Sequence, residues 1–333
     1  MNIAVLGATG AVGRTMLEVL AEREVPVERL VPLASERSAG RTLEWRGAQY
    51  EIAAPSPEAF EGIDYALFSA GASRSREWAP VAAAAGALVI DNSSAWRQDP
   101  EVPLVVPEVN ADALADIPKG IIANPNCSTI QAVVALSPFL REAGLKRVIY
   151  TTFQSVSGAG ESGREALRKE LRGETPAESP FSRPIHGNAV PQIGDFDEAG
   201  WTGEEVKMRL ETRKILSVPG LHVSATCVRV PVDIGHSVQV TVETERDLSL
   251  DQACEALKAQ EGLVFASDAA AFPTPREVAG HDEVFVGRLR ADPDEPNTFH
   301  FWVVADNLRK GAATNAVQIL EALRRESRVG SAV

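Results

Sequence analysis

The residue with the clearest capacity for covalent chemistry in this sequence is Cys127. It lies in the segment 124–129, NPNCST, after a run typical of a buried strand and before apolar residues at helical spacing that reach about Ala143. Because Pro125 disfavours helix in the residue before it, we expect Cys127 where a strand ends and a helix begins. Unpaired N–H groups and the helix dipole favour the nucleophilic thiolate at such a position. The alternative is a small buried apolar residue.

An arginine and a histidine lie on two consecutive predicted strands, at 222–231 and 236–242. Arg229 falls on a mostly apolar strand, where a charge is costly to bury unless it meets an anion. His236 opens the next strand, and its imidazole can give or take a proton near neutral pH. We therefore expect both side chains near one end of the same sheet.

The helix predicted at 202–216 carries two charged residues on one face. It begins with Thr202 and Glu205 in a capping-box pattern, and Glu204 and Lys207 follow at i and i+3. From the sequence alone, the pair is interpreted as a surface ion pair.

The elements around these residues are expected as follows. A strand at 147–154 ends at Gln154, and the small residues after it suit a loop whose backbone touches a ligand. A helix follows at 161–171, and the four prolines of 174–194 predict a long irregular excursion. Pro138 lies inside the helix after Cys127 and predicts a bend or an early end there.

The first half of the chain has the pattern of a nucleotide site. A strand at 2–6 leads into the glycine turn 7–13 and then a helix, an arrangement in which a pyrophosphate rests on the helix N-terminus. The alternative is a merely tight turn. After the second strand, Ser35, Arg37 and Ser38 favour NADP, whereas Glu36 keeps NAD open.

Two later strands, at 65–68 and 87–90, also end in small polar residues, where the ligands of α/β proteins lie. Arg97 follows the second of them. It is either a surface charge or an anion clamp, since its planar fork suits phosphate.

Composition sets the class of protein. The chain has 333 residues, enough for about two domains, and is 44% hydrophobic and 24% charged, as in globular proteins. A formal net charge of -13 argues against nucleic acid or an anionic membrane as the main partner. Three cysteines form no disulfide framework, and Cys227 and Cys254 are interpreted as structural. No membrane span or secretory signal is present, so a cytoplasmic protein is expected.

These residues together resemble the bacterial form of the aspartate-β-semialdehyde dehydrogenase family. The matching segments run in the order of that family and span nearly the whole chain. They are GATGAVG at 7–13, ASERSAG at 34–40, DNSSAWR at 91–97, NPNCST at 124–129, QSVSGAG at 154–160, EEVKM at 204–208, CVRVPV at 227–232, His236, and DNLRKGAA at 306–313.

The resemblance implies a reaction, the reduction of aspartyl 4-phosphate by NADPH to aspartate semialdehyde with release of phosphate and without a metal. It implies that Cys127 forms an acyl-thioester and that His236 is the acid and base. The residues implied to bind the substrate are Gln154 and Asn126 for the acyl group, Arg97 and Lys207 for phosphate, Arg229 for the α-carboxylate and Glu204 for the α-ammonium. The predicted cofactor residues are Gly7, Thr9, Gly10, Ala11, Val12, Ser35, Arg37, Ser38, Ser157, Gly158 and Asn307.

We therefore predict an α/β protein with an N-terminal Rossmann-type dinucleotide-binding domain and an α+β catalytic and dimerisation domain with a large mixed sheet. The resemblance places the first domain at 1–125 with the C-terminal helix 312–333, and the second at 126–311. It also implies a homodimer and a role in the biosynthesis of lysine, methionine, threonine and diaminopimelate.

Three alternatives share part of this pattern. N-acetyl-γ-glutamyl-phosphate reductase shares the logic, but its cysteine segment is of a His-Pro-Gly-Cys type, and an acetylated amine needs no partner such as Glu204. A non-catalytic NADP-binding sensor on the same scaffold predicts loss of the thiol or its partners, yet all are present. A glyceraldehyde-phosphate dehydrogenase is disfavoured because the nucleotide half lacks the motifs of that family.

Overall fold

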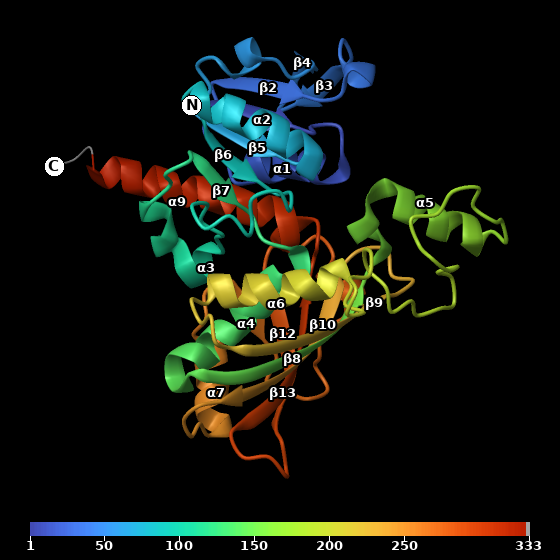
Figure 1. Cartoon of the computed structure of the whole chain (residues 1–333), viewed down its shortest axis with the longest axis vertical. Helices are drawn as coiled ribbons and strands as arrows, with labels where there is room; N and C mark the ends of the chain where they lie inside the picture. The colour runs from blue at the N-terminus through green and yellow to red at the C-terminus, as the bar shows by residue number, and fades with distance from the viewer. Residues whose placement is uncertain (331–333) are drawn as a thin grey trace. The chain divides into compact units, whose positions relative to one another are not determined.

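The structure, a computed structural model, describes residues 1–330, with side chains through residue 325 (Figure 1). The chain forms two compact units. One contains Met1–Pro125 and the chain from Ala312 onward, and the other is Asn126–Gly311. The last three residues of the predicted segment 312–333 lie outside the described residues.

The first unit is built on a five-stranded parallel sheet with the strand order β2-β1-β5-β6-β7. This is the predicted Rossmann-type sheet, and its strands end at one shared edge. The strands are β1 (Asn2–Leu6), β2 (Arg29–Leu33), β5 (Tyr65–Phe68), β6 (Leu88–Asp91) and β7 (Ile121–Ala123). Its helices are α1 (Ala11–Glu22), α2 (Ala72–Ala84), the short α3 (Pro107–Asn110) and α9 (Thr314–Gly330), and a hairpin joins β3 (Thr42–Trp45) to β4 (Ala48–Glu51).

The core of this unit joins both ends of the chain. Buried residues of β1 and α1, such as Val5 and Leu20, belong to one cluster with Val317 and Leu320 of α9. Helix α9 follows a π-helical turn at Arg309–Ala313, so its regular part begins two residues after the predicted start at 312.

The second unit contains a six-stranded mixed sheet with the order β11-β12-β13-β10-β8-β9. Pairs β8–β9 and β11–β12 are parallel and the others antiparallel, which confirms the predicted large mixed sheet. The strands are β8 (Leu145–Gln154), β9 (His222–Arg229), β10 (His236–Thr244), β11 (Leu263–Phe265), β12 (Val284–Ala291) and β13 (Thr298–Ala305). The helices are α4 (Cys127–Ala143), α5 (Gly160–Leu171), α6 (Gly203–Ile215), α7 (Leu250–Lys258) and the short α8 (Pro275–Val278).

One face of this sheet is packed under helices, as Figure 1 shows for α4 and α6. Phe139 of α4 stacks on Phe301 of β13, with ring centroids 5.2 Å apart. Along β10, Val238 and Val240 are buried on this face, whereas the alternating Gln239 is partly exposed on the other. The period of two thus gives the sheet a covered face and an open face.

The structure tests two expectations about secondary structure. Helix α4 continues for 17 residues through Pro138, so the prediction of an early end was wrong. Residues 174–194 contain no helix or strand, as their prolines predicted. Among the described residues, no helix is long and apolar enough to cross a membrane.

Candidate active site

Cys127 is the first residue of α4, where the sequence predicted it, and it is partly buried. The helix is capped by Asn126, whose Oδ1 accepts from the N–H groups of Ser128 and Thr129, both at 3.1 Å. A cysteine directly after the cap lies within the positive end of the helix dipole, which favours its thiolate.

Helix α6 holds Asn126 through two carboxylates. Glu204 Oε1 accepts from Asn126 Nδ2 at 2.7 Å, and Glu211 Oε2 accepts from the Asn126 backbone N–H at 2.6 Å. Neither contact was predicted from the sequence. Together they fix the residue that precedes the thiol.

Glu204 forms the predicted ion pair with Lys207, at 3.1 Å, but it is not a surface residue, because only 5% of it is exposed. Its Oε1 also accepts from Gln154 Nε2 at 3.0 Å. Burial alone would raise the pKa of Glu204. The charge of Lys207 and the hydrogen bonds from Asn126 and Gln154 outweigh burial and lower this pKa to about 2. Glu204 is therefore an ionised carboxylate in the interior.

The covered face of the sheet brings Gln154, Arg229 and His236 to one end, as expected. Arg229 pairs with Gln154 across β9 and β8, and β10 begins at His236 beside β8. All three side chains are buried. Arg229 donates from Nη1 to the carbonyl of Ser155 at 2.6 Å, and burial lowers its pKa although the nearby Glu204 and Cys127 oppose this.

His236 is held from one side of its ring. Nδ1 lies 3.1 Å from the backbone N–H and 3.0 Å from the hydroxyl of Ser155, while Nε2 is buried without a hydrogen-bond partner among the described residues. Burial and the charge of Arg229 lower the pKa of His236 to about 3. Ser155 went unnoticed in the sequence because one serine in a small-residue loop carries no signal of its own.

Two glycines lie against these groups. A Cβ on Gly158 would be 2.7 Å from Arg229 Nη1 and 3.2 Å from His236 Nε2. A Cβ on Gly311 would be 2.9 Å from that of Cys127. Gly158 was predicted as a cofactor contact, whereas Gly311 was only part of a matching segment. Glycine at 158 therefore lets the loop backbone lie directly against Arg229 and His236, where any side chain would clash.

Ser157 and Asn307, also predicted to contact the cofactor, join the network around His236. Asn307 Oδ1 accepts from the Gly235 N–H at 2.9 Å and from the hydroxyls of Ser155 and Ser157 at 3.0 and 3.2 Å.

In the first unit, a cavity of about 550 Å³ lies at the carboxyl edge of the sheet. Of the predicted residues, Gly7, Thr9, Ser35 and Arg37 line it, and so does Glu36. The end of the strand at 65–68, where the sequence predicted a ligand, contributes Ala70. Sequence reasoning missed the walls from other elements, which are Ala54, Pro55, Arg74, Glu77 and Trp78. Ser38 does not line it but is buried in the turn Glu36–Ser38.

The start of α1 fits the pyrophosphate of a dinucleotide. Gly10 is its cap and offers no side chain to the first N–H groups, and the first turn, which begins with Ala11 and Val12, has no acidic residue. Gly7 has a φ of +92°, and a Cβ on Gly13 would be 2.1 Å from the Gly7 carbonyl oxygen, so only glycine allows turn and helix to meet this closely. Such a helix end binds anions.

Arg97 is not a solvated surface charge, because only 7% of it is exposed. Its Nε and Nη2 donate to the carbonyls of Asn124 and Asn92 at 3.0 and 2.9 Å. These bonds fix the guanidinium at the carboxyl edge of β6. Among the described residues, no cluster of three or more His, Cys, Asp or Glu is arranged to hold a metal ion.

The fold and the site define an oxidoreductase of the semialdehyde dehydrogenase class. Residues 2–117 match the family model described as "Semialdehyde dehydrogenase, NAD binding domain", and residues 136–310 match "Semialdehyde dehydrogenase, dimerisation domain".

Individual relatives narrow this class. The chain is 52% identical to "Aspartate-semialdehyde dehydrogenase" of Aquifex aeolicus over 98% of both chains. A solved structure of aspartate semialdehyde dehydrogenase II from Vibrio cholerae, complexed with ASA, is 48% identical, has a TM-score of 0.94, and aligns over 97% of this chain and 98% of its own. A solved structure of aspartate semialdehyde dehydrogenase with NADP from Candida albicans is 25% identical and has a TM-score of 0.77. It aligns over 97% of this chain and 98% of its own. The chain belongs to the aspartate-semialdehyde dehydrogenase family.

Proposed function

We propose that the protein is an NADP-dependent aspartate-semialdehyde dehydrogenase that converts L-aspartyl 4-phosphate to L-aspartate 4-semialdehyde and phosphate through a Cys127 thioester. The observation that carries the proposal is Cys127 at the capped start of α4, with the ionised Glu204 bonded to that same cap. The pathway is then the one that leads to lysine, methionine, threonine and diaminopimelate.

The chemistry begins with the thiol. His236 takes the proton of Cys127, and the thiolate attacks the acyl carbon, so that a C–S bond forms and the C–O bond to phosphate breaks. An acyl phosphate is activated already, so the step needs no metal. The thioester is a better hydride acceptor than a carboxylate, which divides one difficult reduction into two easier steps.

The nicotinamide cofactor supplies the hydride when it is bound. The residues of the chain then complete the reaction. The resulting hemithioacetal oxygen is negatively charged, and as its C=O bond re-forms, the C–S bond to Cys127 breaks and releases the aldehyde. His236 returns its proton to the departing sulfur.

Glu204 supports recognition of a free amine. A carboxylate has about four acceptor sites, and three are filled by Asn126, Gln154 and Lys207. The remaining site on Oε2, next to a fixed negative charge, suits the α-ammonium of aspartate. An acetylated amine is neutral and gains nothing from that charge, so Glu204 favours the aspartate substrate over N-acetylglutamate. Arg229 would hold the α-carboxylate, and Lys207 and Arg97 the phosphate.

NADP is proposed as the cofactor because Ser35 and Arg37 line the nucleotide cavity, where they suit a 2′-phosphate. Glu36 lines the same cavity but is exposed and able to turn to solvent. The Candida albicans enzyme, whose solved structure is the one with NADP, supports the same choice. Residues 1–125 with the chain after 311 would form the NADP-binding domain, and 126–311 the catalytic and dimerisation domain.

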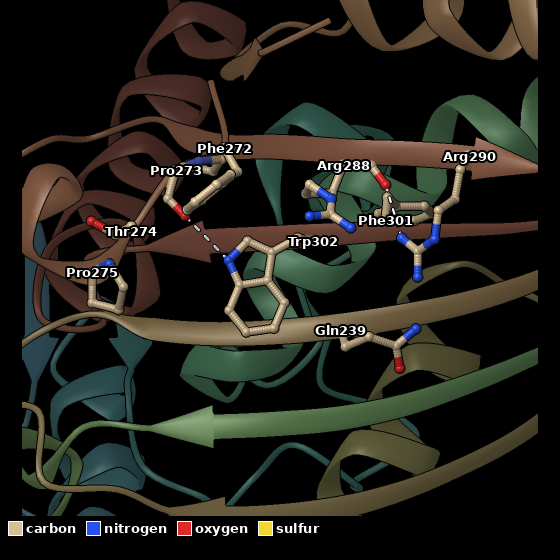
Figure 2. A pocket seen from close by; sticks show the side chains of 9 residues that line it. All are labelled: Gln239, Phe272, Pro273, Thr274, Pro275, Arg288, Arg290, Phe301 and Trp302. Atoms are coloured by element: carbon tan, nitrogen blue, oxygen red, sulfur yellow. Dashed lines mark hydrogen bonds between the residues drawn. The ribbon is translucent and has the colours of Figure 1, made fainter. Parts of the chain in front are cut away.

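The open face of the six-stranded sheet is proposed as the homodimer interface. A cavity of about 310 Å³ lies on it. Figure 2 shows the side chains that line this cavity, with Trp302 and Gln239 on neighbouring strands and the segment 272–275 at its side. Trp302 and Gln239 pair directly across β13 and β10 and are partly exposed. The matching family model is described as a dimerisation domain.

The test is NADPH formation from L-aspartate semialdehyde, NADP and phosphate, measured for the wild type and Cys127→Ala. Phosphate-dependent turnover that the substitution abolishes is expected. N-acetylglutamate semialdehyde is assayed in parallel, and turnover of that compound alone would assign the protein to arginine biosynthesis. A folded protein that binds NADP and turns over neither aldehyde would contradict the proposal.

A further inference from the structure

Ser155 presents two groups to Nδ1 of His236, and they can require opposite protonation states of that nitrogen. The backbone N–H of Ser155 can only donate, so its 3.1 Å contact requires a lone pair on Nδ1. The hydroxyl of Ser155, 3.0 Å from the same Nδ1, can donate or accept. One ring nitrogen cannot satisfy a donor and an acceptor at once, so the direction of the hydroxyl proton determines which tautomer is present.

Asn307 gives that proton its direction. The Gly235 N–H donates to one amide atom of Asn307 at 2.9 Å, which identifies that atom as the oxygen Oδ1. The hydroxyl of Ser155 donates to the same Oδ1 at 3.0 Å. A serine hydroxyl has one proton. The hydroxyls of Ser155 and Ser157 also lie 3.0 Å apart. Whether the Ser155 proton points to Asn307 or to Ser157, the Ser155 oxygen presents a lone pair to His236 and can receive Nδ1–H.

The opposite ring atom is compatible with this direction. Nε2 is fully buried and has no hydrogen-bond partner among the described residues. A buried N–H without an acceptor is rarer in proteins than an acceptor without a donor. A proton on Nδ1 leaves Nε2 as a free acceptor but takes the acceptor away from the Ser155 backbone N–H, whereas a proton on Nε2 satisfies that N–H and leaves Nε2–H without a partner. Each tautomer therefore leaves one N–H unpaired, and the direction of the Ser155 hydroxyl decides between them.

We propose that Ser155 is a positioning residue: its hydroxyl, aligned by Asn307, accepts Nδ1–H of His236 and keeps the Nε2 lone pair free to take the thiol proton of Cys127. The proton balance is complete. Nε2 gains the thiol proton, Nδ1 keeps its own, and the imidazolium donates to Ser155 until Nε2 returns the proton to sulfur. The catalytic part of this inference rests on the proposed function, whereas the tautomer does not.

The substitution Ser155→Ala removes the hydroxyl but keeps the backbone N–H, which then governs the ring alone. We expect His236 to switch to the tautomer with a proton on Nε2, which cannot accept from the thiol. Because general base catalysis contributes about 10²- to 10⁴-fold, kcat should fall at least about 10²-fold with little change in KM. Ser155→Thr retains a hydroxyl and should restore much of kcat.

The tautomer is read directly from ring ¹⁵N chemical shifts of the full-length protein labelled at histidine. The chain has five histidines, and His236→Gln assigns the signal. We expect a protonated Nδ1 in the wild type and a protonated Nε2 in Ser155→Ala. Ser237→Ala is the matched control, because Ser237 is buried beside His236 but points to the opposite face of β10.

Two results overturn the proposal. One is an unprotonated Nδ1 in the resting wild type. The other is a Ser155→Ala protein with the tautomer and kcat of the wild type. If the wild type fails to turn over aspartate semialdehyde, the proposed function fails, and the ¹⁵N spectrum still decides the role of Ser155.

Discussion

At the scale of single residues, one buried ionisable group of the site carries a charge and another is neutral. Glu204 is buried yet ionised, because Asn126, Gln154 and Lys207 all donate to it. His236 is buried and neutral, because burial and Arg229 both oppose a positive charge on its ring. The low dielectric of the interior disfavours the charged form of both groups. Only Glu204 has hydrogen-bond and charge partners that compensate for this cost, so only Glu204 is ionised.

The neutral His236 predicts a dependence of stability on pH. Its pKa falls from an ordinary 6.5 in the unfolded chain to about 3 in the fold, so the unfolded state binds the extra proton in between. Stability from this group is complete above pH 6.5 and declines as the pH falls toward 3. Between pH 7 and 5 the free energy of unfolding should drop by about 2 kcal/mol on this account.

His236→Gln should lose that part of the pH dependence. The measurement is urea denaturation of wild type and variant at pH 7, 6 and 5, with the change in midpoint compared between them. His222→Gln is the control, since it makes the same substitution at a histidine that is exposed at the start of β9. An identical slope in His236→Gln and wild type would show that the ring titrates in the fold as it does in the unfolded chain.

Residue type and periodicity predicted the rarer residues of the site, and the family resemblance added Asn126, Gln154 and Glu204. Cys127, Arg229 and His236 are identified by type against an apolar background, and their positions at strand and helix ends follow from periodicity. Glu211 and Ser155 belong to abundant polar types that normally meet water. Their functions arise from contacts between residues 85 and 81 positions apart in the chain, which no local pattern records.

At the scale of elements, the N-terminus of α4 is held in place by contacts with helix α6 of the same unit. The N-cap Asn126 bonds forward into α4 with Oδ1 and sideways to Glu204 of α6 with Nδ2. The cap therefore has a helix-starting role and a linking role in one side chain.

Replacing Asn126, together with a control at another helix cap, separates its linking role from ordinary helix capping. Asn126→Ala should cost about 1 kcal/mol of stability for the lost cap. It should also lower kcat/KM at least about tenfold, because the buried Glu204 loses a charge-assisted hydrogen bond and shifts. Thermal denaturation and steady-state kinetics measure the two effects.

The matched control is Ser249→Ala, which removes the cap of α7, where Ser249 accepts from the Gln252 N–H at 3.2 Å. It should lower the melting temperature about as much as Asn126→Ala and leave kcat/KM at the wild-type value. Equal kinetic losses in both variants would reduce the role of Asn126 to stability alone.

Two elements show where sequence patterns fail. Pro138 does not end α4, because 13 of its 17 residues are buried and the packing of Phe139 on Phe301 keeps the helix together. The hairpin of β3 and β4 was not predicted, since its turn is Arg46-Gly47 with φ of 50° and 74°, and arginine is unusual there. Arg46 is held in this conformation by bonds to the carbonyls of Leu20 and Val25 at the end of α1.

At the scale of the whole molecule, the first unit is assembled from both ends of the chain. Asn315 of α9 donates to Asn124 Oδ1 at 2.6 Å and to the Val105 carbonyl at 2.9 Å, so the returning segment is bonded to the residue that follows β7, just before the second unit begins. The nucleotide fold is therefore complete only after the entire second unit has been synthesised.

The open face of the sheet gives the prediction at this scale. In a two-fold dimer the same patch of both subunits forms the interface, so a substitution in that patch enters the interface twice. Gln239 lies in the middle of that face, between Thr151 of β8 and Trp302 of β13. Gln239→Lys brings two like charges into a desolvated interface and should weaken dimerisation at least about tenfold. Sedimentation equilibrium over a range of concentrations measures this shift toward monomer.

The control is Gln49→Lys, the same substitution at an exposed position on β4 of the first unit. It changes the net charge identically and should leave the association constant at the wild-type value. Circular dichroism of both variants checks that the sheet is intact. If Gln239→Lys associates as tightly as Gln49→Lys, the open face is not the interface. A wild type that stays monomeric at all concentrations would exclude the homodimer itself.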